Sequence, residues 1–160
     1  MIRLAVLAIA GLSAVAAAQS APRAGQAGAP PPAPAASTEE RARSVWDGVY
    51  TEEQAKRGET VYRERCSSCH QPTLTGGETA GPLVGATFTA NWNGVTVGDL
   101  FERTRVSMPH DRPGTLTRQQ TADVLAYVFS ANKFPAGKTE LARQPELLKQ
   151  IRFDATKPAR

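Results

Sequence analysis

Apolar residues recur at helical spacing in three segments of the chain, about 51–66, 97–106 and 117–131. The first and third begin with a threonine that is followed three residues later by glutamine, the capping-box arrangement of a helix start. The second begins at Thr96, with Asp99 in its first turn. The pattern therefore predicts three helices. Their apolar faces carry Ala55, Gly58, Tyr62 and Cys66 in the first, Leu100, Phe101 and Thr104 in the second, and Val124, Leu125, Tyr127 and Val128 in the third.

The stretch between the first two helices carries turn signals in place of a periodic pattern. Gly76-Gly77, Gly81-Pro82, Gly85 and Asn93-Gly94 predict that this stretch is loop. No segment shows a strong alternation of apolar and polar residues, so we expect no substantial sheet. The predicted fold class is all-α, with three main helices and long loops.

The first 37 residues have the composition of an export leader followed by a linker. Arg3 gives a positive start, residues 4–18 are apolar, and small residues precede a cleavage position after Ala18. The apolar run of about 15 residues is shorter than the roughly 20 that a membrane-spanning helix needs. We therefore expect a signal peptide over 1–18, with an uncleaved anchor as the alternative. Residues 19–37 are almost entirely Ala, Pro, Gly, Gln and Ser, which predicts a flexible linker.

A folded domain is expected over residues 38–136, followed by a basic C-terminal tail over 137–160. The tail holds six Lys and Arg against three Asp and Glu, whereas residues 37–136 hold 11 against 12. The net charge of +4 therefore belongs to the ends of the chain. No long basic stripe with interleaved aromatic residues is present, so we expect no nucleic-acid partner. Apolar residues within 144–153 predict a short amphipathic helix that docks on the domain or on a partner.

The stretch Cys66-Ser67-Ser68-Cys69-His70 is the most informative motif of the chain. Its two cysteines are the only ones in the sequence. C-x-x-C-H is the attachment signature of c-type haem, with Cys66 and Cys69 as thioether anchors and His70 as the proximal iron ligand. A redox disulfide would call for a βαβ context, which is not visible here. A structural zinc site needs four ligands, and only His110 is available as the fourth.

The domain resembles the class I monohaem c-type cytochromes in four motifs. These are the stretch from Gly58 to Cys66, the stretch from Asp123 to Val128, the loop 81–85, and Met108-Pro109. The resemblance implies a cytochrome c fold wrapped around one covalent haem c, in which the first and last helices cross. It also implies that the carbonyl of Pro82 accepts a hydrogen bond from His70 and that Met108 is the distal iron ligand.

Two further residues bear on the haem environment. His110 could replace Met108 and give a bis-histidine haem of lower potential, or it could be an exposed loop residue. Trp92 has an indole N–H that needs a partner if the side chain is buried. By resemblance, a haem propionate is the expected acceptor. A plain core tryptophan is the alternative.

The resemblance implies a one-electron carrier between a dehydrogenase and a downstream respiratory acceptor, and the predicted signal peptide indicates export to the periplasm. It does not imply a catalytic residue of the protein's own. The lead-in 46–50, the segment 88–92 and the loop 108–114 are similar to haem domains that serve quinoprotein dehydrogenases. A first alternative is therefore a cytochrome subunit of such a complex. A second is a haem enzyme or gas-binding protein with a vacant distal site.

Overall fold

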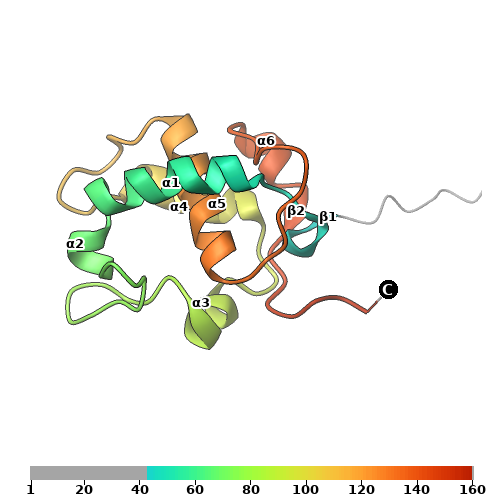
Figure 1. Ribbon diagram of the computed structural model, residues 1–160, viewed down its shortest axis with the longest axis horizontal. Coiled ribbons are helices and arrows are strands. Elements are labelled where there is room, and N and C mark those ends of the chain that lie inside the picture. Colours follow the sequence, from blue (N-terminus) through green and yellow to red (C-terminus); the bar gives the residue numbers. More distant parts are fainter. Residues whose placement is uncertain (1–42, 160) are drawn as a thin grey trace, which may run out of the picture. The chain divides into compact units, whose positions relative to one another are not determined.

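The computed structural model describes residues 43–159. The predicted signal peptide 1–18 and linker 19–37 lie outside the described residues. The longer helices are α1 (Glu52–Arg65), α3 (Gly85–Trp92), α4 (Val97–Ser107) and α5 (Arg118–Ala131). The short elements are β1 (Arg43–Ser44), the 3-10 helix η1 (Val45–Asp47), α2 (Ser67–His70), α6 (Pro145–Leu148) and β2 (Ile151–Arg152). The predicted all-α class is confirmed (Figure 1).

The three predicted helices are present, and each begins at the capping residue that the sequence indicated. The Thr51 hydroxyl accepts a hydrogen bond from the Gln54 amide at 3.1 Å. Thr96 with Asp99 forms a reciprocal capping box at the start of α4. Thr117 does the same with Gln120 at the start of α5. These caps satisfy backbone N–H groups that have no partner inside the helix.

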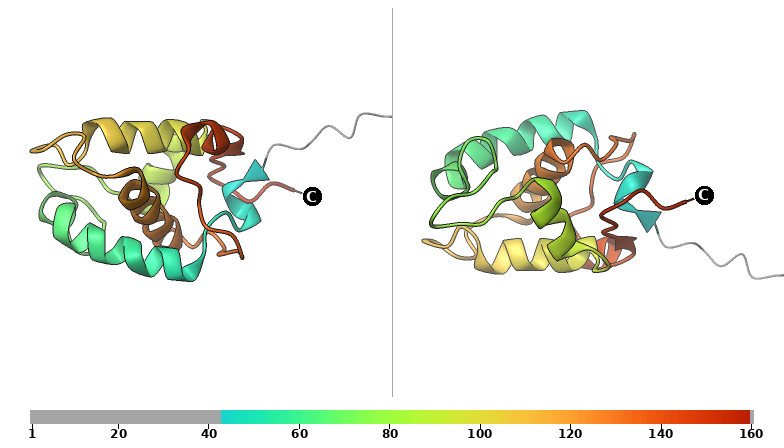
Figure 2. Two further views of the ribbon diagram at one scale, coloured as in Figure 1. Left: turned by 90° about the horizontal axis from the view of Figure 1, so that it is seen from above. Right: turned by 90° about the horizontal axis from the view of Figure 1, so that it is seen from below.

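Helices α1 and α5 cross in close contact through Gly58. A β-carbon on Gly58 would lie 1.8 Å from the carbonyl oxygen of Asp123, so any side chain there would force the helices apart. The rings of Tyr62 and Tyr127 pack beside this contact with centroids 5.3 Å apart. Both views of Figure 2 show α5 lying between α1 and α4. The crossing implied by the resemblance is therefore observed.

The prediction that residues 76–94 form only loop is wrong in its second half. Residues Gly85–Trp92 form α3, whose cap residue Val84 makes no side-chain capping bond. Phe88 is the buried residue of this helix. The expectation of no substantial sheet holds, since β1 and β2 form a parallel pair of two residues each.

The C-terminal residues belong to the core of the domain. Leu141, Leu148, Ile151 and Phe153 are buried in the same apolar cluster as the helices. A β-carbon on Gly98 of α4 would lie 2.8 Å from the backbone nitrogen of Lys149, so the segment packs directly on that helix. The predicted boundary at 136 therefore cuts through the core. The predicted amphipathic helix is shorter than expected, because β2 replaces its second half.

Within residues 43–159, none of the helices combines the length and the apolar character needed to cross a membrane.

Candidate functional site

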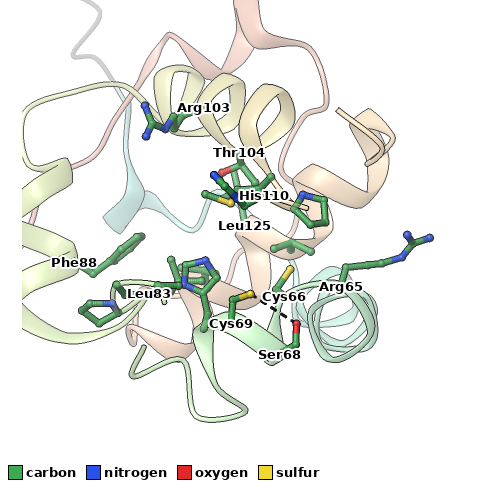
Figure 3. Close-up of a pocket in the computed structure, with 18 of the residues that line it drawn as sticks. Arg65, Cys66, Ser68, Cys69, Leu83, Phe88, Arg103, Thr104, His110 and Leu125 are labelled. Carbon is green, nitrogen blue, oxygen red and sulfur yellow. Dashed lines mark hydrogen bonds between the residues drawn. The ribbon is translucent and has the colours of Figure 1, made fainter. Parts of the chain in front are cut away.

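A cavity of about 750 Å³ lies between α2, α3, the end of α4 and α5. Figure 3 shows the sulfurs of Cys66 and Cys69 on one side of it, with Phe88 and Leu83 across from them. Arg65 and Arg103 extend outward from the rim. The apolar wall consists of Leu83, Phe88, Leu116, Val124, Leu125 and Val128. Size and lining are those of a small-molecule or cofactor site, which typically occupies about 300–1,000 Å³ and is mostly apolar.

The Cys-x-x-Cys-His stretch forms a tight turn at the end of α1. The Cys66 amide still donates to the Tyr62 carbonyl at 2.9 Å. The amides of Cys69 and His70 then both donate to the Cys66 carbonyl, at 3.1 and 3.0 Å. This turn brings both sulfurs and the imidazole to the wall of one cavity.

The two thiols are free in this structure, with no disulfide between them. Burial raises the pKa of the Cys66 thiol to about 11, and the nearby Cys69 adds to the rise. Near neutral pH the thiol is therefore protonated, whereas a redox-active cysteine depends on its thiolate. Within residues 43–159, no three or more His, Cys, Asp or Glu side chains gather in a way that could hold a metal ion.

His70 is oriented by a main-chain carbonyl. Its Nδ1 lies 2.8 Å from the carbonyl oxygen of Gly81. Because a carbonyl can only accept, Nδ1 carries the proton and Nε2 keeps its lone pair for a metal. The prediction assigned this acceptor to Pro82, so the assignment is one residue too far along the chain. Pro82 itself lines the cavity.

The loop that supplies this carbonyl is tied back to the helices. Gly76 donates its amide to the His70 carbonyl at 3.0 Å, and the Tyr62 hydroxyl donates to the Gln71 carbonyl at 2.6 Å. Burial raises the pKa of Tyr62 to about 12, so its phenol remains a donor at physiological pH. The loop therefore holds the Gly81 carbonyl against the imidazole.

Met108 lies at the wall of the same cavity, at the end of α4. Met108 is the C-terminal cap residue of this helix, and its amide donates to the Thr104 carbonyl at 3.0 Å. The side chain is half-buried, and the Met108–Pro109 peptide bond is cis. His110 also lines the cavity and is exposed. The structure thus gathers Cys66, Cys69, His70 and Met108, which lie up to 42 residues apart in the sequence, at one cavity.

Helix α3 supplies a wall that the sequence analysis did not predict. Trp92 lines the cavity and is half-buried, and Phe88 stands one turn before it on the same helix. The spacing of four between these two aromatic residues is a helical signal that the surrounding glycines obscured. Phe88 is therefore the main site residue that the sequence analysis missed.

The side chains present fit a covalently attached haem. Two thiols, an imidazole with a free Nε2 and a thioether sulfur meet an apolar wall in a cavity of suitable size. The thiols would anchor the porphyrin, and the imidazole and thioether are iron ligands of known haem proteins.

The match to a protein-family model agrees with this chemistry. Residues 53–128 match the protein-family model described as cytochrome C oxidase, cbb3-type, subunit III. The crystal structure of the sulfane dehydrogenase SoxCD from Paracoccus pantotrophus contains a similar chain, with 17% sequence identity and a TM-score of 0.45. The similarity covers 68% of this chain and 61% of that one, so the match spans less than two thirds of the solved chain. Among curated proteins, none matches the sequence.

Proposed function

Because the chain is a monohaem c-type cytochrome that carries haem c, we propose that it is an exported, periplasmic one-electron carrier with His70 and Met108 as axial ligands. The observation that supports the proposal most strongly is the shared cavity, which gathers both thiols, the imidazole and the Met108 thioether. The haem supplies the one-electron iron couple, and the protein sets its potential and its exposure.

On the proximal side, the chain fixes which nitrogen of His70 faces the metal. The Gly81 carbonyl holds the proton on Nδ1, and this hydrogen bond also makes the imidazole a stronger electron donor. Since the acceptor belongs to the backbone of a tied loop, the ring orientation does not depend on a flexible side chain.

On the distal side, Met108 would hold the iron through its thioether sulfur. A thioether ligand opposite a histidine raises the reduction potential, as in the cytochromes c. With this ligand in place, the iron would have no open position for a substrate or a gas. The proposed role is therefore electron transfer and not chemistry at the metal.

The apolar wall serves the same role. Val124, Leu125 and Val128 of α5 and Phe88 of α3 are buried and would keep water away from this side of the haem. Low solvent access disfavours the more highly charged oxidised state and so raises the potential. We also propose that the Trp92 indole N–H donates to a haem propionate.

We propose that a dehydrogenase donates electrons and that a respiratory oxidase or another cytochrome accepts them. Contact would be made near the mouth of the cavity, where the lining residues His110 and Asp111 are exposed. Electron-transfer complexes of this kind are small, weak and quickly exchanged.

The test compares the absorption spectra of the wild-type holoprotein with those of Met108→Ala and His110→Ala. We expect a thioether-to-ferric-iron charge-transfer band in the wild type and in His110→Ala, but not in Met108→Ala. Reduced Met108→Ala should bind carbon monoxide, whereas the reduced wild type should not, and its potential should be lower because the thioether is gone.

A charge-transfer band that survives in Met108→Ala, or that is lost in His110→Ala, would contradict the proposed distal ligand. Ready carbon monoxide binding by the wild type would instead favour a haem enzyme or gas-binding protein. Co-purification with a quinoprotein dehydrogenase would favour a subunit of such a complex.

A further inference from the structure

The C-terminal strap, which we define as residues 150–155, lies directly behind one wall of the haem cavity. Phe153 is fully buried, with 0% of its side chain exposed. Its ring packs against Phe88 in an edge-to-face arrangement, with centroids 5.9 Å apart and planes at 85°. Phe88 in turn lines the cavity. Phe153 therefore supports a wall residue without lining the cavity itself.

The backbone of the C-terminal strap is also bonded to the turn that follows α3. The Gly94 amide donates to the Phe153 carbonyl at 2.9 Å, and the Phe153 amide donates to the Val95 carbonyl at 2.8 Å. The Ala155 amide donates to the side-chain oxygen of Asn93 at 2.9 Å. These three bonds hold the end of the helix that carries Trp92.

The other side of the C-terminal strap is fixed to the beginning of the domain. The Ser44 hydroxyl donates to the Asp154 carboxylate at 2.7 Å, and the Trp46 indole N–H donates to the Asp154 carbonyl at 2.9 Å. The pairing of β1 with β2 adds backbone bonds beside them. Because the strap is held from both sides, it cannot easily move with Phe88.

We propose that Phe153 is a positioning residue of the haem site, which keeps Phe88 and the α3 wall against the cofactor and keeps water out. The proposal rests on the proposed haem in the cavity but not on the identity of the distal ligand. It extends the functional unit to a segment about 80 residues beyond the Cys-x-x-Cys-His motif.

The physical consequence is a change in potential. A smaller residue at 153 leaves a void behind Phe88, so the Phe88 ring can move away from the cavity and admit water. A wetter haem environment stabilises the more highly charged oxidised state. Loss of Phe153 should therefore lower the reduction potential while the axial ligands stay in place.

The test compares Phe153→Ala with Phe134→Ala in the holoprotein. Phe134 is a matched control because it is also a buried phenylalanine of the same cluster, yet its ring packs on Trp46, Phe129 and Phe153 and not on Phe88. Both variants should lose stability. In Phe153→Ala the redox equilibrium should shift toward the ferric form about threefold, or about 28 mV at 59 mV per tenfold change. Phe134→Ala should stay near the wild type.

Phe153→Leu keeps an apolar side chain behind Phe88 and should restore only part of the potential, so its value should lie between those of Phe153→Ala and the wild type. It also provides a folded comparison if Phe153→Ala does not accumulate as holoprotein, in which case Phe153→Leu should lie measurably below the wild type. Equal potentials in the wild type and the folded 153 variant, or equal shifts in the 153 and 134 variants, would overturn the proposal.

The charge-transfer band of each variant separates this proposal from the proposed ligation. If the wild type lacks the band, the His/Met assignment fails, yet the comparison of potentials still tests the C-terminal strap. If the band is present in all variants and their potentials agree, the proposed role of Phe153 is wrong while the His/Met assignment stands.

Discussion

Gly58 controls how closely α1 and α5 approach each other. The absence of a β-carbon allows the Asp123 carbonyl to lie against the glycine backbone. Arg57 beside it forms an ion pair with Asp123 at 3.2 Å, in which the Arg57 side chain is 45% exposed and the Asp123 side chain is 6% exposed. The close packing at Gly58 and the ion pair to the buried Asp123 carboxylate therefore lie at the same contact between α1 and α5.

We expect Gly58→Ala to destabilise the protein by about 2 kcal/mol or more. The new methyl group would meet backbone atoms that cannot rotate away, and overpacking of this kind typically costs about 1–3 kcal/mol. Urea denaturation followed by circular dichroism measures the change. Thr60→Ala is the control, since Thr60 is exposed on the same helix and should change stability by about 0.5 kcal/mol at most. Equal stabilities for the two variants would contradict the close contact.

The acceptor for His70 shows where prediction from sequence ends at the scale of a residue. Every residue carries a carbonyl, so the sequence cannot distinguish the carbonyl of Gly81 from that of Pro82. The choice depends on the path of loop 71–81, which is fixed by the Tyr62 hydroxyl and by the Gly76 amide. The thiols, the imidazole and the thioether could be predicted because their chemistry is specific to their side chains.

Among the elements, a helix was predictable where its capping residues were visible in the sequence. Thr51, Thr96 and Thr117 each accept the bond that starts a helix. Helix α3 lacks such a residue and begins at a glycine with a positive φ of 82°, so its first residues read as a turn. Strands β1 and β2 are two residues long and depend on a pairing across more than 100 residues, which no local pattern encodes.

The cap of α4 predicts a dependence of stability on pH. Hydrogen bonds from the hydroxyl and then the amide of Thr96 hold the pKa of Asp99 below its usual range. A carboxyl group with a depressed folded-state pKa stabilises the protein above the unfolded-state pKa, near 3.9, and this contribution is lost as the pH falls further. We expect the free energy of unfolding to decrease as the pH is lowered from about 5, and this decrease should be less steep in Asp99→Asn.

Thermal denaturation of both proteins between about pH 6 and 3 measures the difference in slope. Thr96→Ala removes the hydroxyl that donates to the carboxylate and should also reduce the slope. If the melting temperatures of the wild type and Asp99→Asn depended on pH in the same way, the Asp99 carboxyl would not contribute to the pH dependence in this range.

Across the whole molecule, the apolar core extends from the first described residues to Phe153. The aromatic rings of Trp46, Phe134 and Phe153 pack edge to face in succession, which joins the two ends of the described chain to the back of the haem cavity. The sequence indicated a basic tail after residue 136, because its charge pattern was visible while its long-range packing was not.

A protein that ends at Ala136 should fail to fold as stable holoprotein. Deletion removes four large buried side chains, Leu141, Leu148, Ile151 and Phe153. At about 1.5–3 kcal/mol each, their burial amounts to about 6–12 kcal/mol. That is comparable with the ~5–15 kcal/mol total stability of a typical domain. The yield of protein with attached haem, and its melting temperature, are the measurements. If the shortened protein unfolded cooperatively at a temperature close to that of the full chain, the domain boundary at 136 would be correct.

The pairing of β1 with β2 places both ends of the described chain on the side away from α2 and the Cys-x-x-Cys-His turn (Figure 1). A fusion partner or an electrode linker attached at either end would leave the mouth of the cavity uncovered. The fold thus offers two interchangeable points of attachment for bioelectronic use, and neither requires a change near the cofactor.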